Sequence, residues 1–557
     1  MSVNPPAMIP STTLAVQLVG PSQLCLNANK PVPTPGPTQL LTQVEAVGLC
    51  FSDVKLLKQF SGHVRKAPVI TGLTARQLGE MPNYVPDDAP AVPGHEVVCR
   101  VVAVGNAVAH AKVGDRFIVQ ADYRGLKTEG SNGAFGYNFE GGLQGYVLFD
   151  ERVTGDPGDE AGYLIPVPEG RGASQLALIE PWACVENSYV TPERQGNKAG
   201  GRLLLAGDVP DKLHGLEGLE GVPAEVWILG NDPVGGTLPW AGLKPLIAAS
   251  LDDLPEVPFD DIILFGAETS LAEILDGRLA KGGVLNLVLA GTTFDRPVSL
   301  DVGRIHYGGT RIVGTTSANI AEGYGMIPAT GEARDGATSL VVGAGGPMGQ
   351  MHVIRLLAQF PKLTVVGTDT DPARLEALVR KIGAIPGASS RFRGCLAAEL
   401  GDATFDVVAI MAPVPALIAE ALRRARPGAL VNVFAGIPAG TRYALDLNTL
   451  VQNRAFVFGT SGSEPRDMRL VLEKVIAGAL DTNLSVAAVS GMAGALDGLQ
   501  AVEERTMDGK IVVYPGLANL PLTPLERLSV VCPAAAVKMR NGVWTPEAEA
   551  ALLSSLK

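Results

Sequence analysis

An internal repeat in the second half of the chain constrains its fold more than any other feature. The run "FDDIILFGAETSLAEIL" returns later as "FDVVAIMAPVPALIAEAL", and the segments that follow keep matching. Four matched pairs define the alignment, at offsets of 146, 146, 145 and 145 residues: Phe259–Phe405, Asn286–Asn432, Asp301–Asp446 and Gly314–Gly459. Both runs alternate apolar strands with helical periods, which is typical of parallel βαβ units. The repeat therefore predicts two tandem α/β units, copy one over residues 196–335 and copy two over residues 336–475.

Copy two carries a glycine-rich turn that suits a dinucleotide. In "SLVVGAGGPMGQMHVIRLLAQF" an apolar strand leads through a turn into an amphipathic helix, and the turn holds four glycines: Gly343, Gly345, Gly346 and Gly349. Such glycines let the backbone approach a pyrophosphate at the helix N-terminus. The literal G-x-G-x-x-G spacing fails at Met348, so the motif fits from Ala344 onward. Asp369, with Asp371 as an alternative, would bind the ribose hydroxyls. Copy two is predicted to be a doubly wound Rossmann-like unit that binds NAD, with NADP as the alternative.

Copy one is predicted to be degenerate. Its counterpart of the turn, "LLLAGDVPDKLHGLEG", lacks clustered glycines and a long helix. Asp208 and Asp211 stand where phosphate oxygens would lie. We therefore expect copy one to bind no dinucleotide and to serve a structural purpose.

The N-terminal third has a different pattern of predicted secondary structure. Short β-runs between Gly/Pro turns, such as "EVVCRVVAVG" and "GDRFIVQAD", predict a compact and mainly antiparallel β domain over residues 1–195. Residues 476–557 are expected to return to this catalytic domain and to add a C-terminal extension. The fold class is thus α/β, with an N-terminal β domain ahead of the two tandem units.

Composition excludes several function classes. The net charge of −12 argues against general affinity for nucleic acid or anionic membranes. Apolar runs are too short for a membrane-spanning helix, and the N-terminal residues show no signal-peptide pattern. Six scattered cysteines do not suggest a disulfide framework. We expect a cytoplasmic protein with reduced thiols.

A set of potential metal ligands lies in the β domain. These are Cys50 in "GLCFSD", His95 and Glu96 in "GHE", and Glu180 in "LIEPWACVENSY". Cysteine, histidine and carboxylate are the ligands of catalytic zinc, which keeps one position open. Each residue also has an ordinary explanation, such as a core thiol for Cys50 or a carboxylate favoured by the helix dipole for Glu180.

The four residues in this order, with their neighbours, resemble the zinc-dependent medium-chain dehydrogenase/reductase family. The matching segments are "VEAVGLCFSD", "PGHEVVCRVVAVG", "VGDRF" and "EPWACVENS", followed by the glycine-rich turn. Other segments, including "GYNFEGG", "GTDTDPARL" and the tail "LPLTPLERL…NGVWTPEAEAALL", resemble the L-sorbose-1-phosphate reductase branch. The chain departs from the family in lacking the four-cysteine structural zinc cluster and in carrying a second nucleotide-binding-like unit.

The resemblance implies a GroES-like catalytic domain and the interconversion of a secondary alcohol with its ketone. The family's roles would make Cys50, His95 and either Glu96 or Glu180 the zinc ligands. Ser52 would relay the hydroxyl proton, and Asp53 would orient His95 from behind. The expected substrate is a polyol, a sugar or a sugar phosphate. A simple alcohol or amino-alcohol dehydrogenase is the alternative enzyme, and a non-catalytic binding or structural protein is the alternative of another class.

A basic run follows the zinc cysteine and raises the question of a phosphorylated substrate. It comprises Lys55, Lys58, His63, Arg65 and Lys66. The run is either a solvated loop or a clamp for a phosphate group. The stretch from Cys50 to His95 is longer than the family usually carries and is expected to form a loop or lid near the metal.

The strands "GGVLNLVLAG" and "GTRIVGTT" give copy one an edge of the kind that pairs with another sheet. Copy one either docks edge to edge on copy two as an intramolecular pseudo-dimer or is appended on another face. We predict the pseudo-dimer, in which copy one stands in for a partner subunit.

Overall fold

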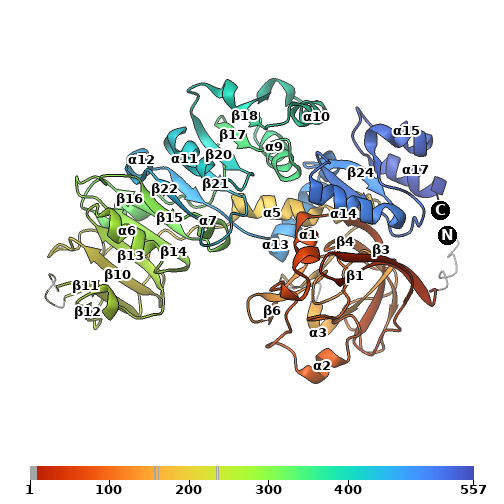
Figure 1. Ribbon diagram of the computed structural model, residues 1–557, viewed down its shortest axis with the longest axis horizontal. Helices are drawn as coiled ribbons and strands as arrows, with labels where there is room; N and C mark the ends of the chain where they lie inside the picture. The colour runs from red at the N-terminus through yellow and green to blue at the C-terminus, as the bar shows by residue number, and fades with distance from the viewer. Residues whose placement is uncertain are drawn as a thin grey trace. The chain divides into compact units, whose positions relative to one another are not determined.

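A computed structural model describes residues 9–155, 159–160, 162–231, 233, 235 and 237–556. The chain divides into two compact units (Figure 1). Unit 1 comprises Met1–Glu186, Arg380–Pro386 and Ser463–Lys557, and unit 2 comprises Asn187–Val379 and Gly387–Gly462. Among the described residues, no helix has both the length and the apolar character needed to cross a membrane.

Unit 1 is built on a sheet that joins the two ends of the chain. Its N-terminal strands pair antiparallel, as the sequence predicts: β3 (Gln39–Gly48) lies between β4 (Glu96–Val104) and β8 (Tyr146–Asp150), and β5 (Arg116–Val119) lies between β4 and β9 (Leu164–Pro166). The C-terminal strands β24 (Val486–Ser490), β25 (Lys510–Val513) and β26 (Thr523–Pro524) extend the same sheet, because β25 pairs with β3. Separate hairpins are β1 (Thr12–Gly20) with β2 (Gln23–Pro31) and β6 (Asp122–Lys127) with β7 (Asn132–Ala134).

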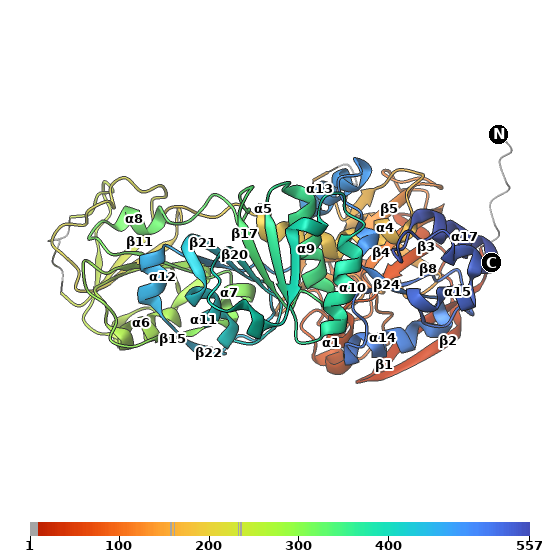
Figure 2. The ribbon, with the colours of Figure 1, turned by 90° about the horizontal axis from the view of Figure 1, so that it is seen from above.

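Helices complete unit 1. The N-terminal segment supplies α1 (Phe51–Gln59), α2 (Ala75–Gly79), α3 (Glu151–Thr154) and α4 (Ala173–Ala177), and α5 (Ile179–Val190) begins in this unit. The C-terminal segment adds α13 (Pro465–Ile476), α14 (Ala495–Glu504), α15 (Leu528–Val531), α16 (Pro533–Ala536) and α17 (Pro546–Leu556). Strand β24 of this segment belongs to the same sheet as β3 and β4 (Figure 2), with β25 between β24 and β3.

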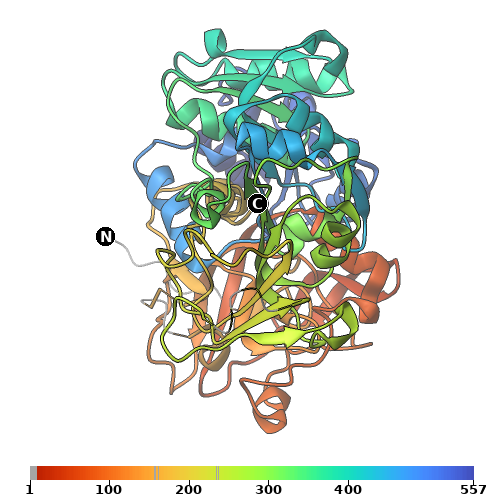
Figure 3. The same ribbon diagram turned by 90° about the vertical axis from the view of Figure 1, so that its left-hand side faces the viewer.

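Unit 2 contains one twelve-stranded sheet with two similar halves. The first half, in yellow-green in Figure 3, has the spatial order β12-β11-β10-β13-β14-β16, and the second has β19-β18-β17-β20-β21-β23. Numbered along the chain, each half has the order 3-2-1-4-5-6 of dinucleotide-binding domains. The first-half strands are β10 (Arg202–Gly207), β11 (Glu225–Leu229), β12 (Leu246–Ala248), β13 (Phe259–Phe265), β14 (Leu279–Val288) and β16 (Arg311–Thr315). The second-half strands are β17 (Thr338–Val342), β18 (Thr364–Thr368), β19 (Phe392–Cys395), β20 (Phe405–Ile410), β21 (Ala425–Val433) and β23 (Phe456–Phe458).

The halves carry unequal sets of helices. Copy two has α9 (Pro347–Gln359) against β17 and β18, and it adds α10 (Pro372–Ile382), α11 (Ala416–Arg423) and α12 (Leu447–Asn453). Copy one has α6 (Thr269–Asp276), α7 (Gly303–Tyr307) and α8 (Ile320–Tyr324). Between β10 and β11 every residue is described and none is helical, so the predicted loss of the helix after the first strand is confirmed.

The two halves join at a seam, which we define as the strand pairs β16–β23 and β15–β22. Strand β16 lies antiparallel to β23 through Ile312 and Val457, whereas the neighbouring pairs of the sheet are parallel. Beside this contact, β15 (Val298–Asp301) pairs antiparallel with β22 (Arg442–Leu445). One apolar core runs through both halves, from Leu203 to Phe458. The two halves therefore form one continuous sheet across the seam. That copy one stands in for a partner subunit stays a prediction.

Candidate active site

The corner between β3 and α1 positions three of the predicted site residues, which are Cys50, Ser52 and Asp53. Cys50 has an extended backbone (φ −131°) and is the N-cap of α1. Asp53 lies in the first turn, where a carboxylate is favoured by the helix dipole, and its Oδ2 accepts a hydrogen bond from the Cys50 amide at 3.0 Å. Gly48 leaves room for the Glu96 carboxylate, because a Cβ atom there would lie 2.0 Å from Glu96 Oε2 and would displace it.

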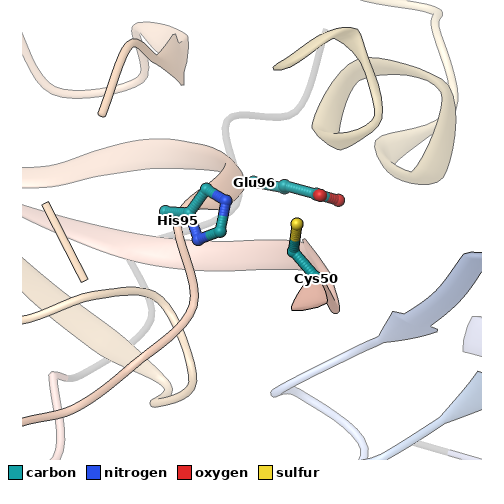
Figure 4. Close-up of side chains that lie close together, drawn as sticks. All are labelled: Cys50, His95 and Glu96. Atoms are coloured by element: carbon teal, nitrogen blue, oxygen red, sulfur yellow. The ribbon is translucent and has the colours of Figure 1, made fainter. Parts of the chain in front are cut away.

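Strand pairing brings the "GHE" segment to the same place. Glu96 opens β4 directly opposite Gly48 at the end of β3. One ligand atom each from Cys50, His95 and Glu96 lies within 4.8 Å of the others, and the three side chains point toward one another (Figure 4). His95 and Glu96 are buried, and Cys50 is half-buried. A thiol, an imidazole and a carboxylate at these separations form a donor set that suits Zn²⁺.

Asp53 holds the imidazole from behind. Its Oδ1 lies 3.0 Å from His95 Nδ1 and also accepts a hydrogen bond from the Gly94 amide at 3.2 Å. Burial opposes protonation of His95, but the Asp53 carboxylate outweighs it and raises the pKa of the imidazole well above its usual value. The contact leaves the other ring nitrogen as the one available to a metal.

Lys510, on β25, sets the electrostatics of the cluster. Its buried ammonium donates to Glu96 Oε1 at 2.5 Å and to the Leu49 carbonyl at 2.6 Å. Burial alone would raise the pKa of the Cys50 thiol, but the Lys510 charge and a hydrogen bond with His95 lower that pKa to about 6. Cys50 is therefore biased toward the thiolate, the form that binds metals.

Glu96 provides the test of whether the site suits a cation. The carboxylate is fully buried, and its Oε2 has no hydrogen-bond partner among the described residues. Burial, together with the negative charge of Cys50 and Glu180, raises the pKa of Glu96 well above its usual value despite Lys510. A divalent cation would bind this free oxygen and offset the negative charge, so the residues present fit Zn²⁺.

Glu180 and Ser52 lie beside the cluster rather than within it. Glu180 lies in the first turn of α5, and its Oε1 accepts a hydrogen bond from Cys184 Sγ at 3.8 Å. It is outside the group of close ligand atoms, although its charge acts on Glu96 and Lys510. The Ser52 hydroxyl lies 3.7 Å from Cys50 Sγ. The sequence analysis did not identify Cys184 or Lys510 as site residues. Cys184 follows Glu180 by one helical turn, whereas Lys510 is 414 residues from Glu96 and left no local signal.

The basic run separates into side chains with different surroundings. Lys66 is fully buried and donates to the carbonyls of Val85 and Ala89, the latter at 2.8 Å. Lys66 is thus committed to the protein interior, and its inclusion in a phosphate clamp was wrong. Lys58 forms an exposed ion pair with Glu503.

His63 and Arg65 instead gather around Tyr137. The Arg65 guanidinium lies 5.5 Å from the Tyr137 ring centroid, and the His63 ring lies 5.1 Å from it. The same tyrosine ring is 6.1 Å from that of His95. Burial and the positive charges of Arg65 and Lys55 lower the pKa of His63 to about 4. Arg65 therefore supplies positive charge on the Tyr137 side of the metal cluster, whereas His63 is neutral near pH 7.

The glycine-rich turn of copy two has the shape that its sequence predicts. Gly343 adopts a positive φ of 82°, and a Cβ atom at Gly349 would lie 2.1 Å from the Gly343 carbonyl oxygen. The turn leads into α9, whose N-cap is Gly346. Asp369 follows β18, and its Oδ2 accepts from the Gly345 amide at 2.9 Å. These residues fit a dinucleotide, with backbone close to the pyrophosphate and a carboxylate beside the turn.

Comparison with known proteins agrees with this architecture. Residues 36–155 match the alcohol dehydrogenase GroES-like domain. The chain is 30% identical over 260 residues to L-sorbose 1-phosphate reductase of Klebsiella pneumoniae, a match that covers 44% of this chain and 61% of the relative. It is 27% identical over 189 residues to sorbitol dehydrogenase of Gallus gallus, covering 33% and 45%. The chain thus matches less than two thirds of the length of each of these two relatives.

The solved structure of 2R,3R-butanediol dehydrogenase from Bacillus subtilis has a TM-score of 0.50 at 16% identity and covers 90% of this chain and all of its own. This likeness concerns the fold alone. The chain thus contains an alcohol dehydrogenase GroES-like domain and is similar in part of its sequence to polyol and sugar-phosphate oxidoreductases.

Proposed function

We propose that this protein is a zinc-dependent, nicotinamide-dependent oxidoreductase that interconverts a secondary alcohol of a polyol or sugar with its ketone. The observation that carries the proposal is the cluster of Cys50, His95 and Glu96, with ligand atoms within 4.8 Å of one another. Its free carboxylate oxygen and its thiolate-biased cysteine are features expected of a metal centre rather than of a structural core.

In this proposal Cys50, His95 and a carboxylate from Glu96 or Glu180 hold Zn²⁺. Zinc bound there would supply the Lewis acidity that makes the substrate hydroxyl more acidic, and a bound nicotinamide would supply the hydride chemistry. Asp53 keeps His95 in the metal-binding orientation. Ser52 would relay the proton that leaves the substrate hydroxyl, taking it up while passing its own hydroxyl proton on to the cofactor ribose, and the relay would run in reverse when the ketone is reduced.

The cofactor would be held by the turn of Gly343, Gly345, Gly346 and Gly349, with Asp369 accepting from the ribose hydroxyls. A carboxylate at that place repels a 2′-phosphate, so NAD is the preferred cofactor and NADP the alternative.

A phosphorylated substrate is favoured over a neutral one by the positive charge around Tyr137. Arg65 is half-buried beside a ring that also contacts His95, which suits a phosphate carried a few bonds from the reacting carbon. Arg65→Met is expected to raise KM for such a substrate about tenfold or more, since a charge-assisted hydrogen bond contributes roughly 1.5–3 kcal/mol. Lys58→Met is the matched control because Lys58 is exposed and paired with Glu503. An unchanged KM in Arg65→Met would favour a neutral polyol or a simple alcohol.

Copy one would serve as a built-in partner subunit. Dimers of this family commonly pair their cofactor sheets edge to edge, and here β16 of copy one occupies the corresponding edge of copy two. Copy one has lost the glycine-rich turn but keeps the strands that make this contact. The function of copy one is therefore to support the cofactor-binding copy.

The decisive experiment is a cofactor-reduction screen of the zinc-loaded protein. Polyols, polyol phosphates, amino alcohols and simple alcohols would be offered with NAD and with NADP, and ketoses and ketose phosphates with the reduced cofactors. Turnover of a polyol or its phosphate is expected. If no substrate turns over while zinc and NAD both bind, the non-catalytic alternative would replace the proposal.

A further inference from the structure

The strand pairing at the seam is centred on residues that the internal repeat matches. Ile312 pairs with Val457 and Ser299 pairs with Ala444, and in both cases the two residues are 145 positions apart, the offset of the repeat in this region. The helices follow the same rule, because α7 of copy one contacts β23 and its counterpart α12 contacts β16. Matched residues meet each other only on a twofold axis. The seam is therefore a local twofold contact made within one chain.

The side chains at matched positions do not share this symmetry. Gly303 of copy one corresponds to Asn448 of copy two. A Cβ atom at Gly303 would lie 2.0 Å from the Pro438 carbonyl oxygen of copy two, so this place has no room for a side chain. Asn448 occupies a roomier place, where its amide exchanges two hydrogen bonds of 3.0 Å with the Phe294 backbone. A second copy two in the place of copy one would drive its Asn448 into the opposing Pro438.

A charged side chain also distinguishes copy one from a second copy two at the seam. Arg311 of copy one corresponds to Phe456 of copy two, and the Arg311 guanidinium lies 6.0 Å from the Phe456 ring. The guanidinium also donates to the Gly459 carbonyl at 3.2 Å and is paired with Glu193 at 2.8 Å. A second copy two would bring a phenylalanine instead and could donate nothing to Gly459.

Copy two in turn reaches across with a residue that copy one lacks. Arg442 donates to the carbonyls of Ser299 and Glu273, the latter at 3.0 Å. Its counterpart in copy one is Pro297, which has no polar side chain. Because of these three differences, the seam surfaces of copy one and copy two are complementary to each other, whereas two surfaces of copy two are not complementary.

We propose that the edge of copy two accepts copy one and rejects a second copy two. The inference rests on the built-in partner role proposed above and adds the identity of the partner, which is copy one of the same chain. Chains of this protein accordingly do not pair through their cofactor sheets.

Single cysteines on the twofold axis test the proposal without relying on turnover. If copy two of one chain paired with copy two of another chain, residue 444 of the first chain would lie opposite residue 444 of the second. Ala444→Cys would then form a disulfide between the two chains. In the proposed arrangement it stays unlinked, whereas Ser299→Cys with Ala444→Cys forms a disulfide within one chain, since directly paired antiparallel residues have Cα atoms about 4.5–5.5 Å apart. Cys25→Ser in every variant removes an exposed native thiol.

The outcomes separate the two levels of the proposal. No intrachain disulfide in the double variant would overturn the built-in partner role. An intrachain disulfide together with interchain dimers of Ala444→Cys would overturn the selectivity alone. The oxidised products are distinguished by non-reducing electrophoresis and mass spectrometry.

The glycine and asparagine positions supply a second measurement. In the double-cysteine background, Gly303→Asn or Gly303→Ala is expected to slow intrachain cross-linking about tenfold, which corresponds to about 1.4 kcal/mol and lies within the usual cost of overpacking. Asn448→Gly removes two hydrogen bonds without a clash and should have the smaller effect. Equal effects of the two exchanges would refute the steric argument. If the Gly303 variants do not fold, the Ala444→Cys result still decides the question.

Discussion

Asp53 is the residue whose removal tests the metal centre most directly. Its side chain is completely buried and accepts hydrogen bonds from the Cys50 and Gly94 amides, and its Oδ1 lies 3.0 Å from His95 Nδ1. Asp53→Asn keeps the shape of the side chain but removes the charge that orients the imidazole. We expect the variant to fold and to bind zinc more weakly.

The magnitude can be reached by two routes. Loss of an outer carboxylate behind a histidine ligand weakens metal binding roughly 10–100-fold, or about 1.4–2.8 kcal/mol. One charge-assisted hydrogen bond, which is what the histidine contact represents, contributes roughly 1.5–3 kcal/mol. The two ranges agree, so the expected effect falls well within the range of a competition assay.

The assay is a zinc titration of wild type and Asp53→Asn against a chelating dye, with thermal unfolding measured in parallel. Asp150→Asn is the matched control, because Asp150 is also buried but is bonded to Arg152, Thr38 and Gln39. The control is expected to lose stability while keeping its zinc affinity. Unchanged zinc affinity in Asp53→Asn would refute the proposed role of Asp53.

Three further predictions concern the ligands, the cofactor and pH. Cys50→Ser and His95→Ala should each lose about one zinc per chain by elemental analysis, and undiminished zinc in both would remove the assignment. Asp369→Ala should weaken NAD and relatively favour NADP in kcat/KM, and a wild type that strongly prefers NADP would contradict this. Burial and Arg355 lower the pKa of His352 to about 3. Because the folded state then binds fewer protons than the unfolded state, His352 reduces stability as pH falls below about 6.5, by roughly 1.4 kcal/mol per unit. This loss of stability continues down to about pH 3. In thermal unfolding, His352→Gln should therefore lose less stability than wild type between pH 7 and pH 5. An equal loss in both proteins would contradict the proposed effect of His352.

Local sequence motifs were sufficient for the parts of the site that are contiguous in the chain. Cys50, Ser52 and Asp53 share one corner between a strand and a helix, so their mutual geometry is largely set by their spacing. The repeat likewise predicted two halves that each contain a parallel sheet, because the strand and helix periods in the sequence are local properties. Both inferences depend on short-range order alone.

Contacts between distant segments could not be obtained in this way. Lys510 reaches Glu96 only because β25 joins the sheet beside β3, and a lone lysine in a strand carries no sign of that pairing. Lys66 illustrates the opposite error. It belongs to a run that reads as solvated or ligand-binding, yet it turns inward to the carbonyls of Val85 and Ala89, and nothing in the run distinguishes it from Arg65.

The covalent link between the two copies has a thermodynamic consequence that a dimer of separate chains would lack. In a dimer the edge contact depends on protein concentration, because dissociation competes with pairing. Within one chain the second copy is present at a fixed effective concentration, which is in the millimolar range for short flexible linkers. The seam can therefore tolerate one-sided contacts, such as Arg311 over Phe456, that an isologous dimer would have to duplicate on both sides of its axis. Under the proposal copy one neither repeats these contacts nor binds a cofactor, so it can diverge at positions that serve neither its own core nor the seam.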